Sequence, residues 1–212
     1  MELTEYDTVA FVGDSITEWG RDLSDPTTLG LGYVSKLVNA LETAHHSKRH
    51  YYNFGKRGYQ VEDVIRILPQ IRMVHPTAIV LLIGVNDVWH YMNHKSERTI
   101  IEEKRRFKAV YRQLITQLLD ITPRILVLEP FLMMYPLQRL NWRELLDYNI
   151  QSIRSIVYQH HLEYVALDGM LMEAMYRFDG EMLTKDGVHP KATAQYLMVE
   201  DIKRHLEFKN GR

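Results

Sequence analysis

The sequence predicts a single α/β domain built on a five-stranded parallel sheet. Short runs of β-branched and aromatic residues alternate with segments whose apolar residues recur at helical spacing, from one end of the chain to the other. The 212 residues suffice for one sizeable core, and no repeat, low-complexity tract or Pro- and Gly-rich linker marks a domain boundary. We therefore expect residues 1–212 to form one three-layer α/β/α sandwich with right-handed crossovers.

Five apolar runs account for the predicted strands. Residues 8–12 form the first, and Gly13 then allows a tight exit into Asp14 and Ser15. Residues 77–83 form the clearest strand, because a central parallel strand is buried on both faces and is therefore apolar along its length. The other strands are expected at residues 50–54, 124–129 and 163–168.

Helices are expected between these strands. Thr99 and Glu102 form a capping-box pattern for a long helix that reaches about residue 120. We interpret its charge run at residues 102–106 as a solvated face, and residues 90–97 before it as a polar excursion. The other helices are predicted at residues 33–41, 60–73, 141–159 and 191–208, with a short one within residues 169–178.

Composition excludes several classes of function. Lys and Arg number 26 against 27 Asp and Glu, so no net field favours nucleic acid or an anionic membrane as a partner. The chain has no cysteine, which excludes disulfides, thiolate metal sites and a cysteine nucleophile. No apolar stretch approaches the length of a membrane span, and residues 1–7 are acidic where a secretory signal needs basic residues. We expect a cytoplasmic soluble protein.

Polar side chains gather at four places where predicted strands end or comparable turns occur. Ser15, residues 53–58 and residues 86–87 follow the first three strands. In a parallel sheet these ends lie along one edge, so the three segments should converge on one crevice. Residues 186–189 precede the last helix and can fold back over the same edge.

The serine has two interpretations. Ser15 is either the N-cap of the next helix or a nucleophile that a base activates. Asp186 can reach Nδ1 of His189, three residues later, and leave Nε2 free for Ser15. The alternative is that Asp186 caps a turn and that His189 is one of ten histidines, at the surface.

A serine nucleophile also needs donors for the oxyanion. The backbone N–H groups of Ser15 and Gly58 and the side-chain amide of Asn86 can supply them. Alternatively, Gly58 only permits a positive φ and Asn86 only caps a helix. All of these residues occur together at sheet exits, and this favours catalysis.

The four segments resemble the signature segments of the SGNH hydrolases, the GDSL-type esterases and lipases. They match in the family's order, at residues 13–16, 53–58, 84–87 and 186–189. The resemblance implies a flavodoxin-like SGNH hydrolase fold over nearly the whole chain and a serine esterase without metal or organic cofactor.

The resemblance also implies a role for each matching residue. Ser15 is the nucleophile, Asp186 and His189 are the acid and the base, and Ser15, Gly58 and Asn86 form the oxyanion hole. One residue departs from the pattern. Arg57 stands where the family commonly has serine or another small residue. Arg57 lies either on the surface or in the crevice, where it would favour acidic or sugar-acid substrates.

Residues 13–21, 29–34 and 84–89 are similar to a bacterial branch of carbohydrate acetylesterases that includes acetylxylan esterases. This implies an acetyl or other short acyl ester on a sugar hydroxyl. Trp19, Tyr33 and Trp89 are then candidates for sugar stacking, or else pack in the core or at the rim. Phe131, just past the fourth strand, is a candidate for the acyl side of the crevice, with the same packing alternative.

Two other functions stay open. One is an acylhydrolase for longer chains, such as a lysophospholipase or thioesterase, and the other is a catalytically silent carbohydrate-binding module on the same fold. A homo-oligomer is also open, because residues 133–135 fit either an interface or a pocket wall.

Overall fold

The computed structural model describes residues 1–45, 48–94 and 97–208. Its main sheet has five parallel strands in the order β3-β2-β4-β5-β6. The second strand of this sheet in sequence, β3, therefore lies at one edge, and the first, β2, lies beside the third, β4. The strands are β2 (Thr8–Gly13), β3 (His50–Asn53), β4 (Ala78–Leu82), β5 (Ile125–Leu128) and β6 (Glu163–Val165). The predicted parallel sheet and its flavodoxin-like order are confirmed.

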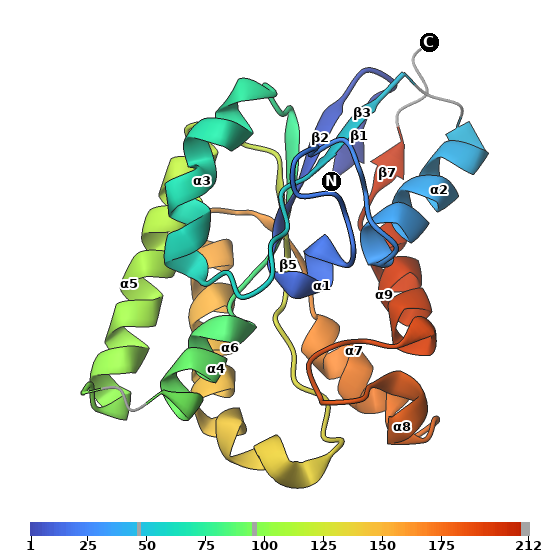
Figure 1. The fold of residues 1–212 in the computed structure, drawn as a ribbon. Coiled ribbons are helices and arrows are strands. Elements are labelled where there is room, and N and C mark those ends of the chain that lie inside the picture. The colour runs from blue at the N-terminus through green and yellow to red at the C-terminus, as the bar shows by residue number, and fades with distance from the viewer. Residues whose placement is uncertain (46–47, 95–96, 209–212) are drawn as a thin grey trace.

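Helices cover both faces of the sheet (Figure 1). One layer contains α2 (Tyr33–His45), α7 (Leu167–Ala174) and α9 (Ala192–Arg204). The opposite layer contains α3 (Val61–Met73), α5 (Ile100–Leu119) and α6 (Arg143–Gln159). This is the three-layer sandwich that the alternation of strands and helices predicts.

The central strand explains why its sequence is apolar. In β4, Ala78, Val80 and Leu82 belong to the core shared with α2 and α9, whereas Ile79 and Leu81 belong to the core shared with α3 and α5. Successive side chains of a strand point to opposite faces, so a strand covered on both sides must be apolar at every position.

The predicted helix at residues 191–208 is too long. α9 ends at Arg204, and β7 (Glu207–Phe208) instead pairs in parallel with β1 (Glu2–Leu3), outside the main sheet. Strands of two residues have no periodicity that a sequence pattern could reveal. The remaining short elements are α1 (Ser15–Glu18), η1 (Leu137–Trp142), a 3-10 helix, and α8 (Gly180–Leu183).

The expected polar excursion at residues 90–97 is partly helical. α4 (Val85–Asn93) begins after Gly84, which caps it, and buries Val85 and Val88. Residues 95 and 96 lie outside the described residues. Across the described part of the chain, the helices are too short or too polar to span a membrane.

Candidate active site

Ser15 is held at the carboxyl end of β2 by a tightly packed turn. A Cβ on Gly13 would lie 2.3 Å from the carbonyl oxygen of Leu82, so only glycine allows β2 to pass β4 so closely. The next residue, Asp14, caps α1 by accepting the N–H of Ile16 at 2.9 Å. The N-cap is therefore Asp14, and Ser15 is the first residue of α1, with its hydroxyl free for another partner.

That partner is a histidine from the other end of the chain. The Oγ of Ser15 lies 2.9 Å from Nε2 of His189, and Nδ1 of the same ring lies 2.7 Å from Oδ2 of Asp186. Partial burial alone would raise the pKa of Asp186, but hydrogen bonds from the ring and backbone of His189 hold it well below its ordinary value. Asp186 is therefore a carboxylate that orients the imidazole toward the serine.

The turn that carries both residues is fixed by its own hydrogen bonds. The Oγ1 of Thr184 accepts the N–H of Gly187 at 2.9 Å and donates to the carbonyl oxygen of His189 at 3.0 Å. Gly187 has a φ of 85°, and its carbonyl oxygen accepts the N–H of Met133 at 2.8 Å. The loop after β5 thus holds the turn in place through the hydrogen bond between Met133 and Gly187. Spacing along the sequence does not reveal this contact.

The expected oxyanion donors lie beside Ser15. Gly58 has a φ of 80° and an ideal Cβ there would meet nothing within 4 Å, so its backbone borders open space. The amide of Asn86 donates one hydrogen to the carbonyl oxygen of Tyr59 at 3.0 Å, which joins α4 to the loop that holds Gly58. Both residues line the same cleft as Ser15.

Asn53, for which the sequence indicates no separate role, connects α1 to two loops around the cleft. Its side-chain nitrogen donates to the carbonyl oxygens of Thr17 at 2.7 Å and Leu29 at 3.0 Å, and its oxygen accepts the N–H of Gly55 at 2.8 Å. Asn53 is fully buried, so these bonds satisfy the nitrogen and the oxygen of an amide side chain that water cannot reach.

Two buried acids, Asp14 and Asp87, adjoin the cleft residues Ser15 and Asn86 in sequence. Burial raises the pKa of Asp14 to about 7, and it raises the pKa of Asp87 to about 6 against the opposing effect of Arg106. Arg106 donates to Asp87 at 2.9 Å and also contacts the buried Glu103. The interpretation of residues 102–106 as a solvated face is therefore wrong for Glu103 and Arg106, which follow the inner face of α5.

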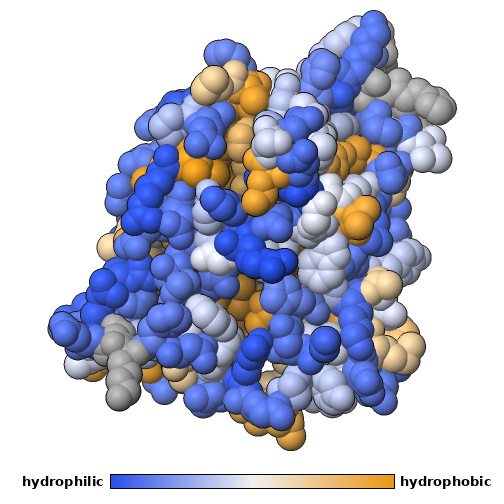
Figure 2. Space-filling model, viewed as in Figure 1, coloured by the Kyte–Doolittle hydropathy of each residue, from blue (hydrophilic) through white to orange (hydrophobic). Residues whose placement is uncertain are grey.

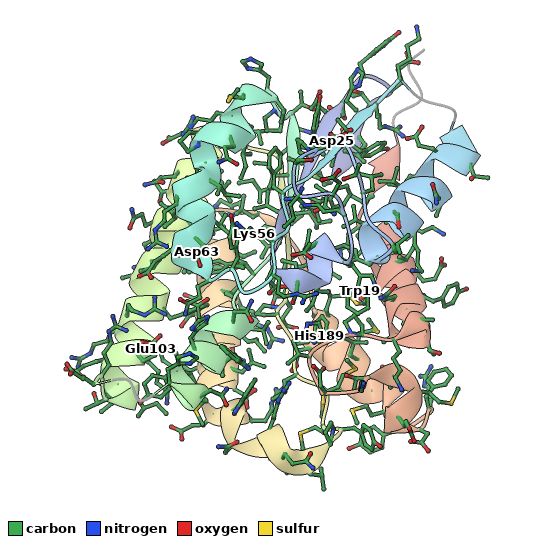
Figure 3. The ribbon with its side chains drawn as sticks, viewed as in Figure 1. Trp19, Asp25, Lys56, Asp63, Glu103 and His189 are labelled. Carbon is green, nitrogen blue, oxygen red and sulfur yellow. The ribbon has the colours of Figure 1, made fainter. Side chains whose placement is uncertain are left out.

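The cleft itself has a volume of about 770 Å³. Its walls include Trp19 and Trp89, and the two arginines Arg57 and Arg139. The other lining residues are Ser15, Glu18, Gly20, Leu31, Gly58, Val85, Asn86, Asp186, Val188 and His189. The rings of Trp19 and His189 have centroids 6.0 Å apart, and both residues lie near the carboxyl ends of the strands (Figure 3).

For two of the candidate substrate contacts, the structure supports the packing alternative. Tyr33 and Phe131 are fully buried and do not line the cleft. The hydroxyl of Tyr33 lies 3.2 Å from Oγ1 of Thr17, and Phe131 packs in the core on the α2 and α9 side of the sheet. Position beside a motif does not distinguish an aromatic ring that faces the cleft from one that faces the core. Among the residues with described positions, no three His, Cys, Asp or Glu side chains form a metal-binding cluster.

Comparisons with known proteins agree with this architecture. A model of the GDSL-like lipase/acylhydrolase family matches residues 11–197. An acetylxylan esterase of Geobacillus stearothermophilus is 23% identical over 218 residues, which cover 99% of this chain and 98% of that protein. A structure of a catalytic mutant of that esterase, with a serine replaced by alanine, has a TM-score of 0.87 at 21% identity and covers 100% of both chains.

Other solved structures are similar in fold. Two further catalytic mutants of the Geobacillus esterase replace an aspartate and a histidine that are three positions apart, with TM-scores of 0.88 and 0.85 at 22% identity. They cover 100% and 97% of this chain, and 100% and 96% of their own. An alpha/beta hydrolase from the metagenome of Lake Arreo, Spain, has a TM-score of 0.83 at 19% identity over 94% of each chain. The family match spans most of the sequence, so this chain belongs to the GDSL-like lipase/acylhydrolase family and is a carboxylic ester hydrolase.

Proposed function

We propose that this protein is a serine esterase that removes short acyl groups, acetyl above all, from sugar hydroxyls. The observation that carries the proposal is the hydrogen-bonded chain from Ser15 through His189 to Asp186 at the wall of the cleft. A nucleophile, a base and an orienting carboxylate stand there in the order that acyl transfer requires.

In the proposed first step, Nε2 of His189 takes the proton of the Ser15 hydroxyl as Oγ forms a bond to the ester carbonyl carbon. The carbonyl oxygen becomes an oxyanion, and the N–H groups of Ser15 and Gly58 and the amide of Asn86 donate to it. The ester C–O bond then breaks, and His189 returns the proton to the departing sugar oxygen.

The second step releases the acyl group. His189 takes a proton from a water molecule, whose oxygen attacks the acyl carbon of the ester on Ser15. The bond to Oγ breaks, the proton returns to Oγ, and the carboxylic acid leaves. These protein groups supply the nucleophile, the base and the oxyanion donors, so the proposed reaction requires no metal or organic cofactor.

The size and walls of the cleft support a sugar ester. A volume of about 770 Å³ is in the range of small-molecule sites. Trp19 and Trp89 line it, and Trp89 is 36% exposed, so indole faces are available for stacking on a sugar ring. The acetylxylan esterase that matches 99% of this chain supports acetyl as the acyl group.

The proposal is tested by hydrolysis of p-nitrophenyl esters from acetate to decanoate, with the wild type beside Ser15→Ala. We expect a rate that falls beyond butyrate and that drops by several orders of magnitude in the variant. Ser24→Ala, a change in an exposed loop away from the cleft, is the matched control and should retain full activity.

The same experiment distinguishes the alternatives. A rate that rises toward decanoate would identify a long-chain acylhydrolase instead. If no rate on any ester depends on Ser15, the proposal is wrong, and a binding protein on this fold becomes the better account.

A further inference from the structure

Two guanidinium groups line the cleft from separate segments of the chain. Arg57 comes from the turn after β3, directly before Gly58, and Arg139 comes from η1, beside Asp186. The sequence leaves open whether Arg57 lies on the surface or in the crevice. In the structure it is exposed and is also part of the cleft wall. On the face shown in Figure 2, strongly hydrophilic side chains lie close to the centre.

The guanidinium of Arg57 has its donors available. The backbone N–H of Arg57 donates to Oε2 of Glu18 at 2.5 Å, which fixes the start of the side chain. Among the described residues, none accepts a hydrogen bond from the guanidinium itself. The neighbouring Lys56 differs, because its ammonium lies 5.5 Å from the centroid of the Tyr59 ring and it does not line the cleft.

Arg139 is held in a fixed position. Its Nη1 donates to the carbonyl oxygen of Asp186 at 2.6 Å, and its guanidinium carbon lies 4.7 Å from the centroid of the buried Trp142 ring. A guanidinium has five N–H donors, and a side chain that is already ordered loses little entropy when it binds a ligand. Arg139 therefore has further N–H donors available to a ligand, in the part of the cleft next to Asp186.

The two acidic side chains of the cleft do not use up these donors. The carboxylate of Asp186 accepts the N–H groups of Val188 and His189 and faces the His189 ring, with Nη1 of Arg139 3.8 Å from Oδ2. The carboxylate of Glu18 accepts the backbone N–H of Arg57. A substrate carboxylate fits the forked donors of arginine in a bidentate manner that neither an ammonium nor a hydroxyl reproduces.

We propose that Arg57 and Arg139 bind a carboxylate on the alcohol part of the substrate, so that the preferred substrate is an acyl ester of an acidic sugar, such as a uronic acid. This inference rests on the proposed esterase activity and specifies its substrate class. A cleft of about 770 Å³ has room for a sugar acid beside an acetyl group at Ser15.

The test compares three esters that differ only at one carbon of the sugar: an acetylated methyl glucuronoside, its neutral methyl ester and the corresponding acetylated methyl glucoside. We expect kcat/KM for the glucuronoside to exceed that for both neutral esters by roughly tenfold at low salt, since hydrogen bonds to charged groups are the stronger class. The preference should shrink as ionic strength rises.

Variants assign the preference to the two arginines. Arg57→Gln and Arg139→Gln should each lower the ratio of charged to neutral kcat/KM about threefold or more, whereas Lys56→Gln, next to Arg57, should leave it unchanged. Arg139 also contacts Asp186, so its replacement should lower the rate of hydrolysis of all three esters. The ratio of kcat/KM values is therefore the readout, because a loss common to all esters cancels in it.

The outcomes separate this inference from the proposed function. Hydrolysis of the neutral esters that depends on Ser15, without a preference for the glucuronoside, overturns the inference and leaves the esterase proposal intact. A preference that survives in both arginine variants also overturns the inference. Absence of hydrolysis that depends on Ser15, on all three esters, overturns both.

Discussion

One carboxylate fixes both the ring and the backbone of His189. Oδ2 of Asp186 lies 2.7 Å from Nδ1 of the imidazole, and Oδ1 of the same carboxylate accepts the backbone N–H of His189 at 2.8 Å. The two residues are only three apart, so the acid and the proposed base form one rigid turn instead of two elements that must be brought into register. Ser15 comes from the other end of the chain. The fold therefore has to bring only two segments together, the start of α1 and this turn.

This turn predicts how the rate depends on pH. The rate should fall on acidification, because a proton on Nε2 of His189 removes the acceptor for the Ser15 hydroxyl. Asp186 stays charged throughout, since its pKa is held far below its ordinary value. The measurement is kcat/KM for p-nitrophenyl acetate against pH; a profile that stays flat down to about pH 5 would contradict a histidine base.

Asn86 should affect turnover more than substrate binding. Asn86→Ala removes a proposed oxyanion donor, so we expect kcat to fall about 10²- to 10³-fold with a small change in KM. Asn93→Ala is the matched control. Asn93 lies in the same helix and its amide also donates to a carbonyl oxygen, that of Trp89 at 2.9 Å, but it does not line the cleft. An equal loss of kcat in Asn86→Ala and Asn93→Ala would show that the effect of Asn86 is structural only.

Two glycines should respond oppositely to alanine. Gly13→Ala places a methyl group 2.3 Å from the carbonyl oxygen of Leu82, so we expect a loss of roughly 3 kcal/mol or more in the free energy of unfolding. At Gly169, inside α7, a Cβ meets nothing within 4 Å, and alanine should stabilise by about 0.5–1 kcal/mol. Urea denaturation measures both changes. A neutral Gly13→Ala would contradict the close approach of β2 and β4.

Asp7 should stabilise the fold at neutral but not at acidic pH. Burial alone would raise its pKa, but hydrogen bonds from Arg124 and Thr77 lower it to about 2. Because its pKa is lower in the folded than in the unfolded protein, the Asp7 carboxylate stabilises the fold fully at pH values above its unfolded-state pKa, near 4. This stabilisation is lost as the pH falls toward 2. Asp7→Asn should therefore cost about 1–2 kcal/mol at pH 7 and much less near pH 2.5. An equal loss in the free energy of unfolding at pH 7 and at pH 2.5 would show that the charge of Asp7 is not the cause.

The sequence predicts the sheet and the four polar segments well for a physical reason. β4 is buried on both faces, so its residues must be apolar and the strand can be recognised from the sequence. Position 13 requires glycine because β2 passes close to β4, so the turn after the first strand can be recognised in the same way. Ser15 and Asn86 could be placed at one edge because parallel strands put their carboxyl ends together. His189 precedes α9 instead, and the sequence indicates only that its turn can fold back over that edge.

The features that the sequence does not reveal depend on contacts between distant segments. Tyr33 lies in a segment similar to the acetylesterase branch and Phe131 follows β5, yet both face the core, which periodicity alone cannot decide. Arg139 reaches Asp186 from η1, 47 residues away along the chain, and no spacing rule anticipates that contact. The pairing of β1 with β7 joins residues about 205 positions apart and involves strands too short to have a pattern.

The position of Trp19 beside His189 gives the enzyme an optical probe of its own base. The two rings have centroids 6.0 Å apart, and a protonated imidazole quenches indole fluorescence more strongly than a neutral one. In a Trp89→Phe background, which removes the indole next to His90 and His94, emission should decrease on acidification in parallel with the rate. His189→Gln should abolish that transition. The protonation of the proposed base then becomes measurable in the resting protein, without turnover and before any natural substrate is identified.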